Sequence, residues 1–212
     1  MPKWPSSNAA SIAAITAAGP DLAGLRELSP LKGGELPTDA EAAIDLLFPG
    51  NPLLCVGLSS SKFATRRRAD WRGELSAMQF LVPSPMTNVW GPTKKGTQSQ
   101  HTLSNTGPRR FLVVEFDEAS ADHQAALLVH LATLAPLAMA LHSGGKSLHG
   151  WFSRGDTDEH HIERFFRYAV SLSADRATWS RCQFVRMPNG LRENGRRQPI
   201  IFLNPELLKE AR

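Results

Sequence analysis

The sequence contains no apolar run of the roughly 20 residues that a membrane-spanning helix requires. It also holds only two cysteines, Cys55 and Cys182, without a CxxC spacing. So few thiols in a chain of 212 residues argue against a disulfide-stabilised fold and against a structural zinc site. These two absences predict a cytoplasmic protein, kept reduced, that does not enter membranes.

The N-terminal segment lacks the features of a secretion signal, although Lys3 precedes it and small residues end it. Segment 8–19 is dominated by alanine and has only two large aliphatic residues, at helical spacing. Ser7 or Asn8 is a suitable N-cap, and Gly19-Pro20 is a stop signal. We therefore expect a short amphipathic helix here.

Charge is distributed unevenly along the chain. The net charge is +4, and arginines and lysines gather in separate islands, two of which flank an acidic motif. Such repetition indicates a polyanionic partner such as nucleic acid, although a solvated surface is the usual explanation for any one island. Trp71 and Trp90 could stack on bases, with burial in the core as the alternative. The candidate contacts are Arg66, Arg67, Arg68, Arg192, Arg196 and Arg197.

Periodicity and turn residues predict an α/β chain of the α+β class with an antiparallel-rich sheet. Residues 1–50 are expected to be helical, and the polar stretch 83–110 is expected to cross the surface. The order β-α-β-β-α-β-β in the second half resembles a ferredoxin-like or RNA-recognition-type sheet with one extra strand. Expected strands are 53–57, 78–82, 137–141, 147–152, 182–187 and 199–203, besides the run that begins at Phe111; expected helices are 42–48, 121–134 and a helix from Asp156 or Thr157 to about Leu172.

An acidic pair ends the apolar run that begins at Phe111. The period of two in a strand places Glu115 and Asp117 on one face, where two carboxylates can share a hard divalent cation. The alternative is a strand end that meets solvent. Asp175 follows the second predicted helix and is either a third ligand or a cap of the next turn. The pair predicts a Mg²⁺ or Mn²⁺ site.

A glycine-rich segment, Ser143–His149, has the composition of a phosphate-binding loop, with flexible glycines, Lys146, a hydroxyl and a histidine. It is not a Walker A loop, because the first glycine of that motif is missing and the segment joins two predicted strands. Arg186 adds a guanidinium suited to bidentate phosphate contact. His149 alone is more often a satisfied histidine.

The three segments together are similar to the motifs of the archaeo-eukaryotic primase superfamily. Glu115-Phe116-Asp117 resembles its acid-x-acid motif, Ser147-Leu148-His149 its Ser-x-His motif, and Asp175 with Arg186-Met187-Pro188 its third motif. The resemblance covers 111–205 best, and 53–110 is similar to the primase domains of phage and mobile-element helicase-primases.

The resemblance implies a primase or primase-polymerase that joins nucleotides on a single-stranded DNA template. It implies that 51–212 form the catalytic domain, with the RNA-recognition-like half at about 111–205, and that a fused or associated helicase is a plausible partner. The implied metal ligands, which bind Mg²⁺ or Mn²⁺, are Glu115, Asp117 and Asp175; the implied contacts to the nucleoside triphosphate are Lys146, Ser147, His149 and Arg186.

Two further hypotheses remain. The first is a nucleic-acid-binding module that has the same fold and no catalytic activity. The second is a metal-dependent nuclease of the replication-initiator type, which requires paired histidines and a nucleophilic tyrosine. Tyr168 is the only tyrosine, and the sequence has no HxH pair, so the nuclease is the weaker hypothesis.

Overall fold

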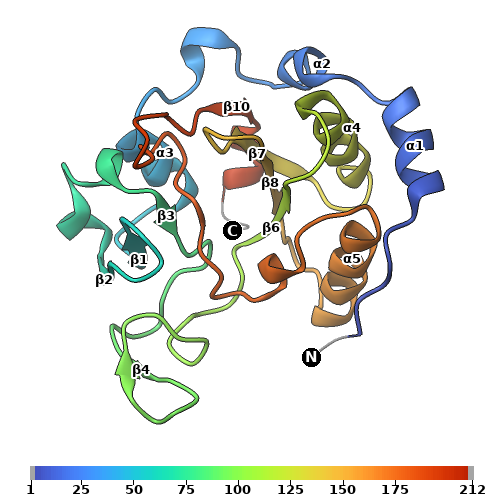
Figure 1. Ribbon diagram of the computed structural model, residues 1–212. Coiled ribbons are helices and arrows are strands. Elements are labelled where there is room, and N and C mark those ends of the chain that lie inside the picture. The colour runs from blue at the N-terminus through green and yellow to red at the C-terminus, as the bar shows by residue number, and fades with distance from the viewer. Residues whose placement is uncertain (1–2, 210–212) are drawn as a thin grey trace. The chain divides into compact units, whose positions relative to one another are not determined.

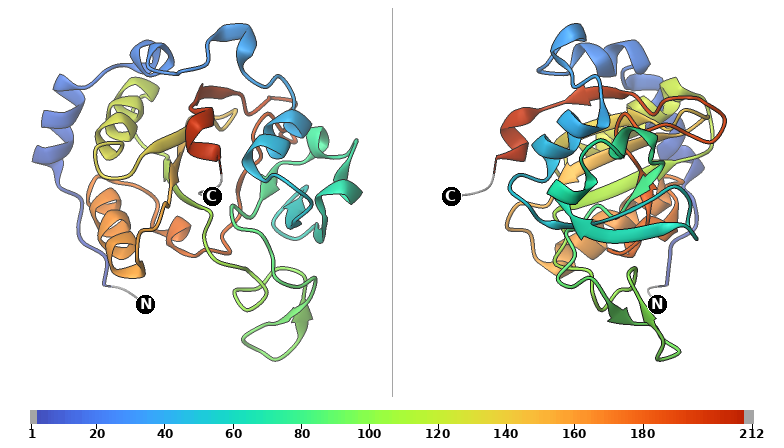
Figure 2. Two further views of the ribbon diagram at one scale, coloured as in Figure 1. Left: turned by 180° about the vertical axis from the view of Figure 1, so that it is seen from behind. Right: turned by 90° about the vertical axis from the view of Figure 1, so that its left-hand side faces the viewer.

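A computed structural model describes residues 3–209 as a mixed α/β chain of two compact units, shown in Figures 1 and 2. Unit 1 comprises the described residues up to Leu36, Leu112–Trp179, and the described residues from Ile200 onward. Unit 2 comprises Pro37–Phe111 and Ser180–Pro199. The first 50 residues therefore contribute to both units. Among residues 3–209, no helix is long and apolar enough to cross a membrane.

Unit 1 is built on a four-stranded sheet of order β10-β7-β8-β6. β6 and β8 are neighbours although α4 and β7 lie between them in the chain, which is the split β-α-β arrangement predicted from the sequence. β10 pairs with β7 and not with β6, so the last strand differs from a ferredoxin-like sheet. The elements are α1 (Ala9–Ala18), α2 (Leu22–Glu27), β6 (Phe111–Phe116), α4 (Ala121–Leu131), β7 (Leu137–His142), β8 (Leu148–Ser153), α5 (Glu159–Ser171) and β10 (Ile200–Leu203).

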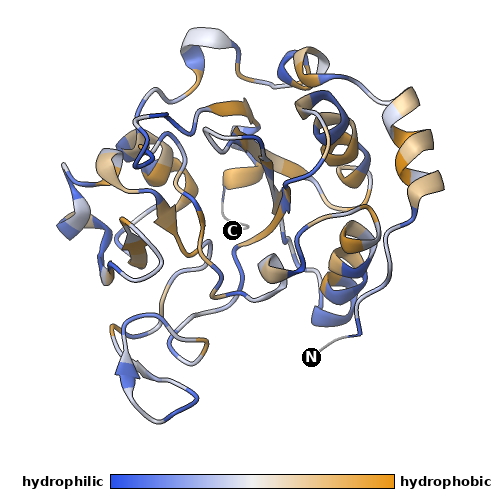
Figure 3. Ribbon diagram, in the orientation of Figure 1, coloured by the Kyte–Doolittle hydropathy of each residue, from blue (hydrophilic) through white to orange (hydrophobic). Residues whose placement is uncertain are grey.

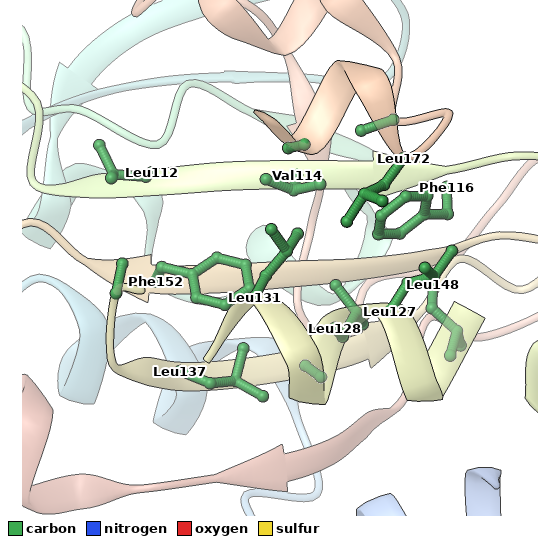
Figure 4. Packing of buried hydrophobic residues seen from close by; sticks show 14 of the residues in the cluster. Leu112, Val114, Phe116, Leu127, Leu128, Leu131, Leu137, Leu148, Phe152 and Leu172 are labelled. Carbon is green, nitrogen blue, oxygen red and sulfur yellow. The ribbon is translucent and has the colours of Figure 1, made fainter. Parts of the chain in front are cut away.

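Alternation along the strands gives this sheet two different faces. On β6, Leu112, Val114 and Phe116 belong to one apolar cluster, whereas the intervening Glu115 is only partly buried. The cluster also takes in the apolar stripes of α4 and α5, and Figure 4 shows the leucines of α4 packed against side chains of the strands. The sheet therefore has a helix-covered face, and on the opposite face of β6 the partly buried Glu115 follows the buried Phe111 and Val113.

Capping residues fix where the helices of unit 1 begin. Ser120 accepts a hydrogen bond from His123 N and starts α4, as predicted. α5 begins one or two residues later than predicted, because Asp158 and not Asp156 or Thr157 supplies its cap. α4 packs closely on β8: a Cβ at Gly150 would lie 2.5 Å from Leu128 Cδ2. α1 and α2 contact α4.

Unit 2 contains a second sheet of order β2-β1-β3-β9 and a separate two-stranded hairpin, β4-β5. The strand pairs with a described register run antiparallel in both units. Helix α3 (Ala40–Leu47) starts at Asp39, which accepts from Ala42 N. The strands are β1 (Leu53–Gly57), β2 (Phe63–Arg67), β3 (Phe80–Leu81), β4 (Gly91–Pro92), β5 (Gln98–Ser99) and β9 (Val185–Arg186).

The sequence did not predict β2, and it made β9 too long; α2 lies in the stretch 1–50 that was expected to be helical. β2 is an edge strand whose last residues, Arg66 and Arg67, are exposed, so no apolar alternation marks it. The segment predicted as a strand at 182–187 contributes only two residues, which pair with β3. The chain thus leaves unit 1 after Trp179 and returns at Ile200, where β10 joins the β7 edge.

Candidate functional site

The acidic pair lies at the carboxyl end of β6, as the alternation predicted. Phe116 points into the apolar cluster, while Glu115 and Asp117 on either side of it are partly buried. The Glu115 side chain is 18% exposed. Two carboxylates thus project from alternate positions of one strand, and both keep access to solvent.

His149 of the Ser-x-His motif lies next to Glu115 of the acidic pair. It lies on β8, is 1% exposed, and its Nε2 is 3.1 Å from Glu115 Oε1. The two atoms are close but not aligned for a good hydrogen bond, and Nδ1 has no hydrogen-bond partner among residues 3–209. A buried imidazole without a partner on Nδ1 is uncommon in a folded protein and indicates a place for water or a ligand.

Asp175, the predicted third acidic residue, also lies next to β6. Its backbone N–H donates to the carbonyl of Glu115 over 2.9 Å. Its carboxylate Oδ1 accepts a hydrogen bond from Ala177 N, and Thr178 Oγ1 donates to its carbonyl, so Asp175 also starts the short helix η4 (Arg176–Trp179). The backbone of Asp175 is therefore fixed beside Glu115, and one of its carboxylate oxygens serves as a cap.

The glycine-rich loop between β7 and β8 is closed by its own hydroxyls. Ser147 Oγ donates to Ser143 Oγ over 2.9 Å, and the amides of Gly145 and Ser147 donate to the same oxygen. Gly144 adopts a φ of +72°, which the turn requires and which favours glycine. Lys146 at the tip is exposed. A phosphate here would meet Lys146 first, because these amides already have partners.

Gln124 on α4 was not predicted as a site residue. It nevertheless connects the loop that follows Asp117 with the loop that precedes His149. Its side chain is fully buried. Oε1 accepts from Leu148 N over 2.7 Å, while Nε2 donates to the carbonyls of Lys146, Glu118 and Ala119. One clue was present in the sequence: Gln124 occupies the apolar stripe of its helix.

The predicted basic contacts and Arg186 all belong to unit 2. Arg68 is 1% exposed and its guanidinium pairs with Glu41 at 2.7 Å and Asp45 at 2.9 Å. This burial corrects the prediction for Arg68, which cannot contact a nucleic acid. Arg66 is exposed but pairs with Glu74 and lies over the ring of Trp71.

The remaining predicted residues of unit 2 have varied surroundings. Arg67 is exposed, and its Nη1 donates to Asn51 O. Arg192 is partly buried and Arg196 and Arg197 are exposed, all in one tight turn. The Arg186 guanidinium lies 4.5 Å from the centre of the Phe80 ring. Trp71 is buried and donates to Leu54 O, which makes it a core residue.

A divalent metal fits the acidic end of β6 only as a partly hydrated ion. Among residues 3–209, no three His, Cys, Asp or Glu side chains form a group that could hold a metal ion, so Asp175 does not join Glu115 and Asp117 in the predicted set of three ligands. Mg²⁺ is commonly held by one or two carboxylates, with water and substrate phosphate completing its shell. Glu115 and Asp117, both in reach of solvent, match that donor set.

Comparisons with known proteins found no relationship. No family model matches the sequence, and no curated protein and no solved structure resembles it significantly.

Proposed function

We propose that unit 1 carries the catalytic site of a metal-dependent nucleotidyltransferase, a primase or primase-polymerase that acts on single-stranded DNA. One observation carries the proposal: three motifs far apart in the sequence converge on the end of β6. His149 lies 3.1 Å from Glu115, and the amide of Asp175 is bonded to the Glu115 carbonyl. A fold alone does not require acidic and imidazole groups to meet there.

Each motif has a distinct task in this proposal. Glu115 and Asp117 hold the divalent ion. The ion, when bound, supplies positive charge that stabilises the negative charge of the reacting phosphate. Lys146, exposed at the loop tip, attracts the triphosphate. His149 is 1% exposed, so its Nδ1 would reach a phosphate only if the surrounding chain moved aside. Ser147 can turn its hydroxyl from Ser143 to a phosphate oxygen at the cost of one hydrogen bond.

The chemistry proposed is the joining of nucleotides. A 3′-hydroxyl attacks the α-phosphate of a nucleoside triphosphate, a new phosphodiester bond forms, and pyrophosphate leaves. Catalysis of such a reaction depends on positioning and on charge compensation more than on covalent chemistry by the protein. Arg186 of unit 2 is assigned to phosphate contact on sequence grounds alone.

Incorporation of a labelled nucleotide on a primer-free single-stranded template tests the proposal. We expect product with Mg²⁺ or Mn²⁺, none with a chelator, and a loss of at least about 100-fold in Asp117→Asn, since metal-held charge compensation contributes several kcal/mol. Glu118→Gln is the matched control, because Glu118 is the next acidic residue and is exposed.

Failure of incorporation has a defined meaning. If the native chain binds the strand without metal and makes no product, the chain is a binding module with the same fold and not a polymerase. If Asp117→Asn and Glu118→Gln make as much product as the native chain, the acidic pair is not the site.

A further inference from the structure

The hairpin β4-β5 is a separate two-stranded element of unit 2 with an exposed turn. Gly91 pairs with Ser99 and Pro92 with Gln98, and the turn between them closes through Thr93 N to Thr97 O and Gly96 N to Thr93 O. The hairpin extends beyond the sheet of unit 2 near the label β4 in Figure 1, and Figure 3 shows hydrophilic residues along it.

A buried asparagine holds the base of this hairpin in one conformation. Asn105 is 1% exposed. Its Nδ2 donates to the carbonyls of Asn88, Val89 and Gln100, and its Oδ1 accepts from the backbone and the hydroxyl of Thr102. These bonds fix the chain immediately before Trp90 and immediately after Ser99. The backbone of Trp90 is therefore preorganised.

Close packing supports the same base. A Cβ at Gly91 would lie 2.6 Å from Thr102 Oγ1 and 2.8 Å from Asn105 Cβ, so only glycine fits at this point. Gln100 is bonded through Oε1 and its carbonyl to Thr65 of β2. The strand that carries exposed Arg66 and Arg67 therefore lies beside the hairpin base.

The side chains on this rigid frame are aromatic and cationic. Trp90 is 56% exposed, whereas Trp71 and Trp151 are buried and Trp4 and Trp179 are partly buried. Lys94 and Lys95 at the turn are exposed and have no carboxylate partner among residues 3–209. The sequence contains no aspartate or glutamate between Glu74 and Glu115, so nothing on this segment offsets their charge.

We propose that this hairpin binds single-stranded nucleic acid, with Trp90 stacked on a base and Lys94 and Lys95 on flanking phosphates. An exposed Trp by itself is ordinary. Here it directly precedes β4, the lysines lie in the turn that follows β4, and its frame is held rigid. Strand binders combine an aromatic platform with cations in this way. Preorganisation lowers the entropy cost of binding.

The hairpin proposal deepens the proposed function, because it names the element that holds the template. In naming a template, it rests on the proposed function. Its test needs neither metal nor nucleotide. The affinity of the full chain for a fluorescently labelled single-stranded thymidine oligonucleotide is measured by anisotropy at several salt concentrations. Native chain, Trp90→Ala, Trp90→Phe and Lys94→Gln/Lys95→Gln are compared. Leu103→Ala, an apolar residue 50% exposed, and the exposed Lys62→Gln are the controls.

The two kinds of variant should differ in a specific way. Removing the stacking partner of a base weakens binding roughly 5- to 150-fold in Trp90→Ala, with the salt dependence unchanged, and Trp90→Phe retains most of the affinity. The lysine double variant lowers the slope of log K against log salt by about 0.7 for each phosphate that is no longer neutralised. Native tryptophan fluorescence is quenched by the oligonucleotide, and Trp90→Phe removes that quenching.

The outcomes separate the two proposals. The hairpin proposal is overturned if Trp90→Ala binds with unchanged affinity and the lysine variant has an unchanged salt slope. The same result is expected if the hairpin binds an acidic protein instead of nucleic acid. If Asp117→Asn abolishes nucleotide incorporation while the hairpin variants bind normally, the proposed function stands without it. Binding that depends on the hairpin in a chain that makes no product supports the hairpin and overturns the polymerase.

Discussion

Replacing Gln124 by methionine tests whether one buried amide holds the two loops of the candidate site together. Methionine has a similar volume, so the change removes hydrogen bonds without opening a large cavity. Leu148 N loses its acceptor at a position that is 0% exposed. The three carbonyls that Nε2 serves belong to exposed residues, and water can replace that donor.

The expected cost is therefore that of a single unsatisfied buried amide, about 1–3 kcal/mol in the free energy of unfolding. Urea denaturation followed by circular dichroism measures it as a lower midpoint at an unchanged slope. His123→Ala, one residue earlier and exposed, is the matched control and should lie within about 0.5 kcal/mol of the native chain. A cost below about 0.5 kcal/mol for Gln124→Met would refute the reasoning.

Three further substitutions probe other features. Ala119 has a φ of +65°, so Ala119→Gly should raise stability by up to about 1 kcal/mol in urea, and a lower midpoint would show that no strain is present. Arg68→Met should cost about 1.5–3 kcal/mol because Glu41 loses a charged hydrogen-bond donor, with exposed Arg67→Met near zero; equal effects would contradict the burial of Arg68. Burial raises the pKa of the Cys55 thiol from 9.0 to about 12, so the unfolded chain releases a proton above pH 9 that the native chain keeps. Native stability should then fall by about 1.4 kcal/mol per pH unit between about pH 9 and 12, more steeply than in Cys55→Ala, and parallel slopes would refute it.

The elements that the sequence predicted well have strong local signals. α4 has a capping serine and a leucine stripe, and β7 and β8 are apolar runs joined by glycines, so their positions follow from short-range pattern. The alternation that places Glu115 and Asp117 on the opposite face from Phe116 is likewise a local property of one strand.

Features set by distant contacts could not be predicted in the same way. β2 is held by pairing with β1, and its own residues are largely polar or charged. Arg68 looked like its neighbours Arg66 and Arg67, yet only Arg68 meets carboxylates from α3. Gln124 reaches partners 22 and 24 residues away. In each case the partner is fixed by tertiary packing, which no local pattern records.

The central claim is that the acidic end of β6 supports nucleotidyl transfer, and the most direct measurement is the amount of pyrophosphate released per nucleotide incorporated on a single-stranded template. The account predicts one pyrophosphate for each nucleotide joined, with both products abolished in Asp117→Asn and kept in Glu118→Gln. Release of inorganic phosphate without incorporation, or incorporation that survives Asp117→Asn, would contradict it.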